Sequence, residues 1–198
     1  PGHTEYLAHL DGKNNYGMML VNKYLRVVPA TIHIPIKDIT RFLNAELIEN
    51  TIKTTHQELT NRFSISNPTI WISGLNPHAG EAGTIGNEEQ KFIVPVLRKL
   101  RSEGYNLKGP MSADTMFYRK KRREFDAAIC MYHDQALLPI KTLDFHSSVN
   151  LTIGLSFIRT SPDHGTAFDI AGKNLANPTS TIEAVSYTHL RAHETVRN

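Results

Sequence analysis

The stretch TIWISGLNPHAGE at residues 69–81 decides the fold, because a short apolar run leads directly into a glycine-rich loop that carries a histidine. The same pattern occurs twice more, in LRVVPATIHIP (25–35) and DAAICMYHDQ (126–135). Apolar runs of four to eight residues bounded by turn residues are typical of buried strands. We therefore expect three buried strands, each followed by a loop that bears a histidine.

Helical patterns separate these runs. Asn44 stands before a segment in which Ile52, His56, Leu59 and Phe63 share one helical face. A second apolar stripe runs from Glu88 to about Arg101, and Pro95 should bend or delay that helix. Strands that alternate with helices predict a mostly parallel α/β sheet. We expect helices at 3–10, capped by Thr4, after Asp38 and after His133, and strands at 18–21, 25–30, 69–74, 126–132 and 149–155.

Composition excludes several classes of protein. The 198 residues suffice for one substantial domain or two small ones, and no apolar run is long enough to span a membrane. The net charge is only +3, and the basic run at 119–123 is typical of a solvated face rather than a nucleic-acid surface. The single cysteine, Cys130, fits a reducing compartment and favours a buried structural thiol. We expect a cytoplasmic protein without nucleic-acid or membrane partners.

Three histidines follow the three apolar runs: His33, His78 and His133. The carboxyl ends of parallel strands meet at one edge of a sheet, where ligands bind. Neutral imidazole is a common ligand of zinc and related divalent ions. Each histidine taken singly is more often a structural group, and their wide spacing is not diagnostic. The residues alone therefore leave a shared metal site and three structural histidines both open.

Four polar stretches also lie near expected strand ends. GHT (2–4) offers an imidazole, a hydroxyl and backbone N–H groups suited to an anion. The other stretches are GPMSADTMF (109–117), the segment that ends at Lys141, and VNLTIGLSFIRTSPDHGTAFD (149–169). Each also has a structural interpretation, such as a helix cap, a surface charge, or a turn at Asp163–Gly165. The candidates for chemistry are His3, Thr4, Asp114, Lys141, Asn150 and Arg159.

The glycine-rich loop LNPHAGEAGTIG (75–86) is no standard nucleotide motif. Its spacing differs from the G-x-G-x-x-G fingerprint of the Rossmann fold, and no Gly-Lys-Ser/Thr follows it. The loop can still approach a cofactor or a substrate phosphate.

Taken together, these stretches resemble the 4-hydroxythreonine-4-phosphate dehydrogenase family of pyridoxal phosphate biosynthesis. The resemblance is carried by PGHTEYLA, TIHIPIKDI, GLNPHAGEAG, GPMSADTMF, MYHDQALLPIK and VNLTIGLSFIRTSPDHGTAFDIAG. It spans about residues 1–185 with the order of the motifs intact. It implies an α/β fold like that of isocitrate and isopropylmalate dehydrogenases, with two domains.

The resemblance also implies a truncated chain. Residues 1–185 would be a dehydrogenase fragment, comprising most of the second domain and part of the first, without the N-terminal part. The tail SYTHLRAHETVRN (186–198) lacks apolar periodicity and suggests a non-native end.

The resemblance to the family extends to the residues of its active site. By motif, the metal ligands would be His33, His78 and His133, at a homodimer interface that uses both subunits. His3, Thr4, Lys141, Asn150 and Arg159 would bind substrate. The implied reaction is NAD- or NADP-linked oxidation of 4-phosphohydroxy-L-threonine. The resulting 3-keto acid would lose carbon dioxide to give 3-amino-2-oxopropyl phosphate.

A divalent ion held by neutral imidazoles (zinc, magnesium or cobalt) can act as a Lewis acid on the alcohol oxygen. Lys141 or Asp114 would take the hydroxyl proton. Arg159 and Lys141 suit a phosphate or carboxylate.

Two alternatives stay open. The substrate can be another phosphorylated hydroxy acid, such as 4-phosphothreonate, or a cyclic dihydrodiol. The chain can also be a catalytically inert metal-binding fragment.

The sequence departs from the family pattern at three places. Ala82 and Ala136 stand where glycine is usual, and Ser156 stands where proline is common. An alanine at a position with positive φ would cost stability.

Overall fold

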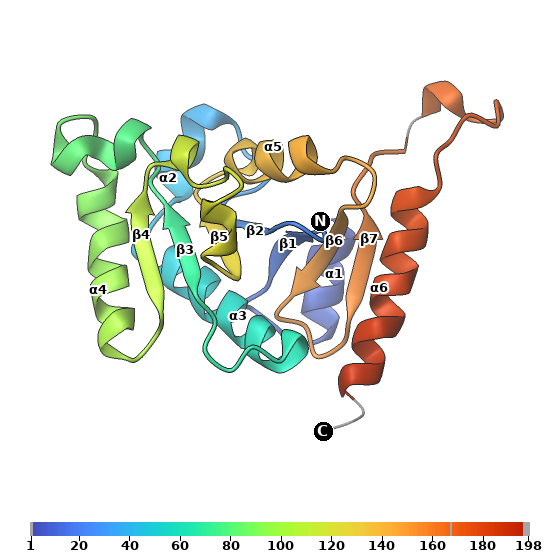
Figure 1. Cartoon of the computed structure of the whole chain (residues 1–198), viewed down its shortest axis with the longest axis horizontal. Helices are drawn as coiled ribbons and strands as arrows, with labels where there is room; N and C mark the ends of the chain where they lie inside the picture. The colour runs from blue at the N-terminus through green and yellow to red at the C-terminus, as the bar shows by residue number, and fades with distance from the viewer. Residues whose placement is uncertain (1, 167, 196–198) are drawn as a thin grey trace.

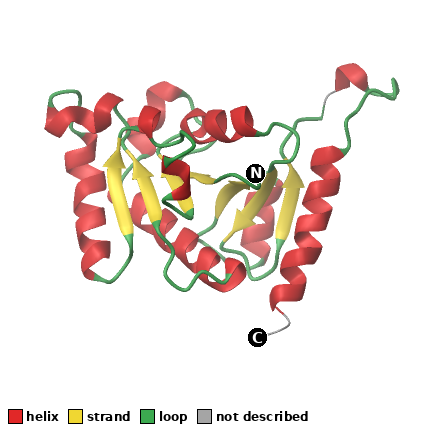
Figure 2. Ribbon diagram, in the orientation of Figure 1, coloured by secondary structure: helices red, strands yellow, loops and turns green. Residues whose placement is uncertain are grey.

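A computed structural model describes residues 2–166 and 168–195, and side chains as far as 189. A seven-stranded mixed sheet crosses the molecule, with helices on both faces (Figures 1 and 2). The strand order is β4-β3-β5-β2-β1-β6-β7. The strands are β1 (Gly17–Val21), β2 (Arg26–Pro29), β3 (Ile70–Ser73), β4 (Leu107–Met111), β5 (Ala127–Cys130), β6 (Val149–Ile153) and β7 (Arg159–Pro162).

The helices fill the segments between the strands. They are α1 (His3–Leu10), α2 (Ile39–Phe42), α3 (Ala45–Phe63), α4 (Val94–Ser102), α5 (His133–Leu143) and α6 (Thr179–Thr195). The α/β prediction is confirmed. None of the described helices is long and apolar enough to cross a membrane.

The sheet is half parallel and half antiparallel. β4, β3, β5 and β2 run parallel, whereas β1 is antiparallel to both β2 and β6, and β7 is antiparallel to β6. The prediction of a mostly parallel sheet is therefore wrong for the half built from β1, β6 and β7. Short connections explain the difference: only four residues separate β1 from β2 and five separate β6 from β7, whereas a parallel crossover needs a dozen or more.

Each face of the sheet has its own core. The larger core joins α3 and α4 to the sheet through residues such as Ile52, Leu97 and Ile129. The smaller core lies under α5 and includes Trp71 and Cys130. Cys130 is fully buried and burial raises the pKa of its thiol to about 12, which confirms the prediction of a structural thiol.

Several elements differ locally from the sequence expectation. β4 and β7 were not predicted, because neither KGPM nor RTSP has an apolar run. Asn44 caps α3 as predicted, by accepting the backbone N–H of Leu47. Gly2, not Thr4, is the N-cap of α1, so that Thr4 lies inside its first turn.

The helix predicted from Glu88 begins as a wide π turn at Glu89–Ile93 and becomes α-helical only at Val94. Pro95 accounts for this, because it has no N–H to close an α-helical bond to the preceding turn.

The C-terminal segment is helical farther than expected. α6 extends to Thr195 and lies along β7 (Figure 1). The Tyr187 ring lies 6.3 Å from the Phe63 ring, and the hydroxyl oxygens of Thr188 and Thr160 are 2.6 Å apart. Residues 186–188 therefore belong to the packed fold, since α6 continues through them against β7. The non-native origin of 186–198 stays a prediction, and residues 196–198 lie outside the described part.

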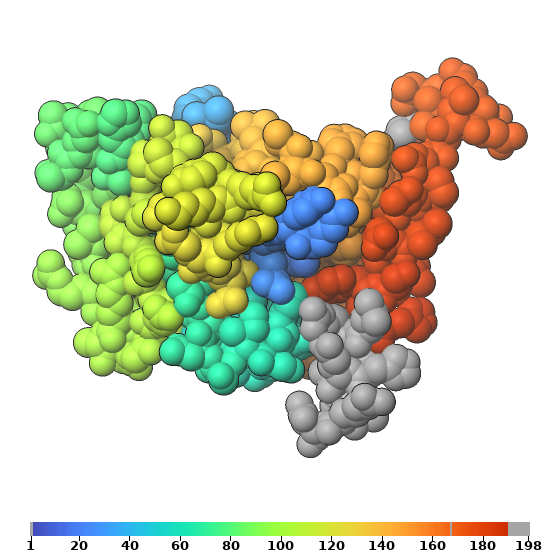
Figure 3. Space-filling model, viewed as in Figure 1, coloured from blue at the N-terminus to red at the C-terminus, as the bar shows by residue number. Residues whose placement is uncertain are grey.

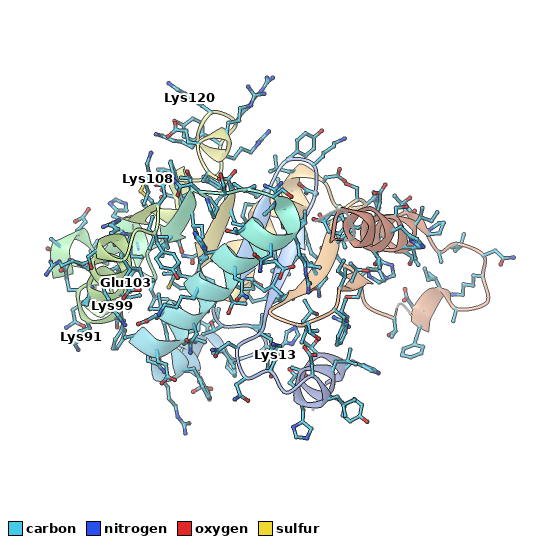
Figure 4. All side chains as sticks on the ribbon, turned by 90° about the horizontal axis from the view of Figure 1, so that it is seen from below. Lys13, Lys91, Lys99, Glu103, Lys108 and Lys120 are labelled. Carbon is cyan, nitrogen blue, oxygen red and sulfur yellow. The ribbon has the colours of Figure 1, made fainter. Side chains whose placement is uncertain are left out.

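The basic run is only partly a solvated face. The segment that contains it lies against the β1–β2 turn, as the yellow and blue surfaces in Figure 3 show. Lys121 lies over the Trp71 ring at 5.5 Å and Arg122 over the Tyr24 ring at 5.6 Å. Lys120 points away from the sheet into solvent (Figure 4). Part of the run therefore covers the smaller core through cation–π contacts.

Candidate active site

The loops after β2, β3 and β5 gather at one edge of the sheet, at the top of Figure 1. The ends of β2 and β5 are in register, since Pro29 pairs with Cys130. Beyond that pair, Ala30 N–H donates to Cys130 O, and the Thr31 hydroxyl donates to Met131 O at 2.7 Å. These bonds hold the two histidine-bearing segments together past the ends of their strands.

Two of the three predicted metal ligands are consequently neighbours. The ring centroids of His33 and His133 are 5.7 Å apart. They border a small hollow of about 210 Å³ that is otherwise lined mainly by Ile32, Ile34, Ile36 and Tyr132. His133 is the first residue of α5, and its Nδ1 lies 2.7 Å from Asp134 Oδ1.

His78 lies apart from His33 and His133. Its imidazole is exposed, and its Nδ1 lies 2.8 Å from Glu81 Oε1. No hydrogen bond or ring contact joins it to His33 or His133 within the described residues, and these residues contain no group of three His, Cys, Asp or Glu side chains placed around one point. The three histidines thus share the sheet edge, but only two of them meet in one chain.

The donor set fits a divalent metal ion. In both His78 and His133 the Nδ1 atom is engaged by a carboxylate, which leaves Nε2 for a ligand. A carboxylate on the far nitrogen is the usual arrangement behind a metal-binding histidine, because it fixes the ring and raises its basicity. His33 adds a third imidazole beside His133.

A glutamine joins the strand ends beneath these histidines. Gln135 Oε1 accepts the Ser73 hydroxyl and the Met131 N–H, both at 2.7 Å, and Gln135 Nε2 donates to Gly74 O at 2.9 Å. Gln135 thereby ties the end of β3, which leads to His78, to the end of β5, which leads to His133. Sequence reasoning missed this residue, although its place two positions after His133 was a usable signal.

The predicted substrate ligands form a second group, beside α5 and β6. Arg159 Nη1 lies 3.0 Å from the Thr152 hydroxyl and 3.4 Å from the Thr4 hydroxyl, so the sequence-predicted pair Thr4 and Arg159 is brought together. Asn150 shares the α5 side of β6 with Thr152, because Leu151 and Ile153 pack in the opposite core. Its buried Oδ1 accepts no hydrogen bond from any described residue. His3 is exposed at the start of α1.

Lys141 pairs with Asp163, a residue that the sequence analysis had placed in a turn. Its Nζ lies 3.3 Å from Asp163 Oδ1 and 3.2 Å from Asp163 O. Desolvation raises the pKa of the Asp163 carboxyl, and the positive charge of Lys141, which pairs with it, opposes that rise. The helix α5 carries both His133 and Lys141 and so connects the histidine pair with the substrate group.

Asp114 lies apart from Lys141. It is exposed in the turn at Ala113–Thr115 and accepts the Ser112 hydroxyl at 2.6 Å. That turn contacts the loop that carries His78.

Known proteins with similar sequences identify the family of this chain. Residues 1–188 match the model of the family described as pyridoxal phosphate biosynthetic protein PdxA. The chain belongs to the PdxA family. It is 57% identical to 4-hydroxythreonine-4-phosphate dehydrogenase of Roseobacter denitrificans, over 100% of this chain and 60% of that protein.

Solved structures of the family share its fold. The 4-hydroxythreonine-4-phosphate dehydrogenase from Klebsiella pneumoniae superposes with a TM-score of 0.89 at 40% identity, over 97% of this chain and 58% of that one. A terephthalate 1,2-cis-dihydrodiol dehydrogenase from Burkholderia xenovorans has a TM-score of 0.77 at 33% identity, over 95% of this chain and 60% of that one. The isocitrate dehydrogenase-like α/β class predicted from sequence is thus confirmed. The chain spans 55–60% of the length of the curated relatives it matches.

Proposed function

We propose that the protein to which this chain contributes oxidises 4-phosphohydroxy-L-threonine with NAD or NADP. The 3-keto acid then loses carbon dioxide to give 3-amino-2-oxopropyl phosphate. Family membership and the names of relatives at 46–57% identity support this proposal. The observation that carries it is the pair of imidazoles, His33 and His133, 5.7 Å apart at a sheet edge that α5 joins to Lys141.

We propose His33, His78 and His133 as the ligands of a divalent ion (zinc, magnesium or cobalt). When bound, such an ion supplies Lewis-acid stabilisation of negative charge on the substrate oxygen, in the oxidation and in the loss of carbon dioxide. Asp134 and Glu81 orient two of the rings.

The substrate's anionic groups are assigned to the second group of residues. Arg159 can make planar two-point contacts to a phosphate or carboxylate, and Lys141 provides a point charge. The Thr4 hydroxyl beside Arg159 adds a donor, and the buried Oδ1 of Asn150 can accept from a substrate hydroxyl or amine. We keep His3 in this set on the strength of the family motif.

For the hydroxyl proton we favour Lys141 over Asp114. Lys141 in its neutral form can accept the substrate proton at Nζ, and its Nζ lies 3.3 Å from the half-buried carboxylate of Asp163, which can hold the resulting ammonium in place. NAD or NADP would accept the hydride, and the substrate C–O bond would then become a carbonyl. Asp114 is solvated and lies on the His78 side, so that it is the second choice.

We further propose a cytoplasmic homodimer in which one subunit completes the other's site. The exposed imidazole of His78, turned outward with its Nδ1 already engaged, supports a ligand shared across an interface. We retain the division into a dehydrogenase fragment at 1–185 with parts of two domains.

The test uses the complete protein of family length, with NAD or NADP, a divalent ion and 4-phosphohydroxy-L-threonine, followed at 340 nm. His133→Ala should abolish turnover and metal uptake. The matched control His9→Ala changes an exposed histidine at the end of α1 and should leave both unchanged. Retained turnover in His133→Ala would refute the site, and metal uptake without turnover in the wild type would favour an inert metal-binding module.

A second substrate class follows from the comparison with the dihydrodiol dehydrogenase. The histidines do not distinguish a phosphorylated hydroxy acid from a cyclic dihydrodiol. Arg159 and Lys141 favour an anionic substrate such as 4-phosphohydroxythreonine or 4-phosphothreonate. Parallel assays of 4-phosphohydroxythreonine, 4-phosphothreonate and a cyclic dihydrodiol separate these alternatives by the ratio of the three kcat/KM values.

A further inference from the structure

The loop that carries His78 has an unusual backbone. Five successive residues, His78 to Ala82, have left-handed φ values of 53°, 54°, 77°, 41° and 56°. Four of them are not glycine. The left-handed conformation costs a non-glycine residue roughly 1–2 kcal/mol, so the surrounding structure must impose a turn of this kind.

A buried carboxylate lies at the base of the turn. Glu89 is 1% exposed, and its Oε1 accepts the backbone N–H groups of Leu75 and Asn76 at 2.8 and 2.7 Å. Its Oε2 accepts from Asn76 Nδ2 at 3.0 Å. One side chain thus holds the two residues through which the chain leaves β3 and enters the turn.

The turn is fitted closely around this carboxylate. A Cβ on Gly80 would lie 2.5 Å from Glu89 Oε2, and one on Gly74 would lie 2.6 Å from the Cα of Ala79. Gly80 O then accepts the N–H of Ile85, which closes the loop behind the turn. The left-handed run therefore wraps over the Glu89 carboxylate at close range.

The His78 side chain has little other support. It is 64% exposed, and its Nδ1 lies 2.8 Å from Glu81 Oε1, which belongs to the same turn. Within the described residues this imidazole is not enclosed by packing, so its position follows from the backbone beneath it. Glu89 reaches that backbone from the π turn at Glu89–Ile93.

We infer that Glu89 is a positioning residue that fixes the left-handed turn and thereby sets the position of the exposed His78 imidazole. The link to a metal ion rests on the proposed function, whereas the link to the turn does not. Sequence reasoning missed Glu89, because a carboxylate at the start of an amphipathic helix is normally interpreted as a solvated first-turn residue.

The experiment compares Glu89→Gln with two controls in this chain. Glu88→Gln removes a neighbouring carboxylate that bonds the Asn76 side chain but no strand-end N–H. Glu58→Gln alters a carboxylate of similar burial that pairs with Arg62 in α3, far along the chain from the turn. A glutamine at 89 removes the negative charge that strengthens the bonds from Leu75 and Asn76, and it presents an NH2 group to Asn76 Nδ2 where Oε2 now accepts, so that the clamp is weakened with little change of volume.

Two readouts need no metal. Amide hydrogen exchange at Leu75 and Asn76 should accelerate at least tenfold in Glu89→Gln, and the ring signals of His78 in NMR spectra should shift. Neither should change in Glu58→Gln, even if both variants lose global stability. Unchanged exchange and unchanged His78 signals in Glu89→Gln would overturn the inference.

A third readout uses cobalt(II) alone as the probe in the protein of family length. The affinity for cobalt should fall 10–100-fold in Glu89→Gln, as for other groups that orient a ligand from behind, and stay within twofold in Glu58→Gln. An altered turn with undiminished cobalt affinity would overturn the role of Glu89 in positioning His78. If the wild type binds no cobalt, the proposed function fails, and the first two readouts still decide whether Glu89 places His78.

Discussion

The left-handed turn predicts opposite effects for two substitutions two residues apart. Gly80 has φ 77° and its missing side chain makes room for Glu89, whereas Ala82 has φ 56° and is exposed. Ala82→Gly removes a strain of roughly 1–2 kcal/mol but makes the unfolded chain more flexible, which costs about 0.4–1 kcal/mol. The free energy of unfolding should therefore rise by about 0.5–1 kcal/mol.

Gly80→Ala adds left-handed strain, makes the unfolded chain less flexible, and also places a Cβ too close to Glu89. The new Cβ would lie 2.5 Å from Glu89 Oε2, and Glu89 has little freedom because it is buried and holds Leu75 and Asn76. Weakening even one buried hydrogen bond to a carboxylate costs about 1.5–3 kcal/mol. The total loss should be about 2–4 kcal/mol, which for a chain of this size lowers Tm by at least about 4 °C.

Urea unfolding followed by tryptophan fluorescence measures both changes, because Trp71 is the only tryptophan and is 1% exposed in the smaller core. Equal m-values for the variants and the wild type would show that the shifts report stability. A Gly80→Ala variant as stable as the wild type, or a destabilised Ala82→Gly, would refute the left-handed geometry and the fit of Glu89 beneath it.

Three further predictions concern other parts of the molecule. Because desolvation raises the pKa of Asp163 above 3.8, the native state holds its proton to higher pH than the unfolded state. Stability should therefore fall as pH rises through the range between the pKa of Asp163 in the unfolded chain and its higher pKa in the native state. Asp163→Asn should flatten the dependence of the urea midpoint on pH. The Cys130 thiol, with a pKa of about 12, should resist a thiol reagent at pH 8 in the native chain and react in urea; rapid native labelling would contradict its burial. Ser156→Pro removes both the hydroxyl that donates to Asp11 Oδ1 and the N–H that donates to Asp11 Oδ2 at 2.7 Å, so the pKa of Asp11, now held below its usual value by these two bonds, should rise in a carboxyl NMR titration.

The parts of the fold that follow from apolar pattern were predictable. The runs at 69–74 and 126–132 are short, continuous apolar stretches of the kind that buried parallel strands have, and they appear as β3 and β5. β4 and β7 were not visible, because an edge strand half exposed to solvent needs no apolar run. The antiparallel half followed from loop length, a signal that was present in the sequence but not used.

The candidate site was predictable in its residues but not in its geometry. Motif reading selected Thr4 and Arg159, which meet, and His33 and His133, which lie side by side. It did not anticipate that His78 stands apart in one chain. His78 begins a run of left-handed residues, and no local propensity predicts four non-glycine residues in that conformation.

Polar side chains that hydrogen-bond the backbone of neighbouring loops recur at the edge of the sheet. The Thr31 hydroxyl ties the loop after β2 to that after β5, and Gln135 ties the end of β3 to the end of β5. Glu89 ties the segment that leads from β3 toward His78 to the π turn at Glu89–Ile93. Each tie is a polar side chain that accepts or donates backbone hydrogen bonds, and Gln135 and Glu89 each make three of the bonds described above. Apolar packing would allow small sliding of one loop against the next, whereas hydrogen bonds fix both distance and direction.

The consequence is a site in which the same polar contacts set both geometry and part of the stability. Large apolar cores on both faces hold the sheet. Changing Gln135 or Glu89 to a side chain of similar size should therefore displace the histidines relative to one another and cost about 1.5–3 kcal/mol for each buried charged bond that is weakened, while the cores keep the sheet folded. Binding chemistry at this edge then depends on a few polar ties, because a displacement of about 1 Å in a ligand is enough to lose most of its contribution.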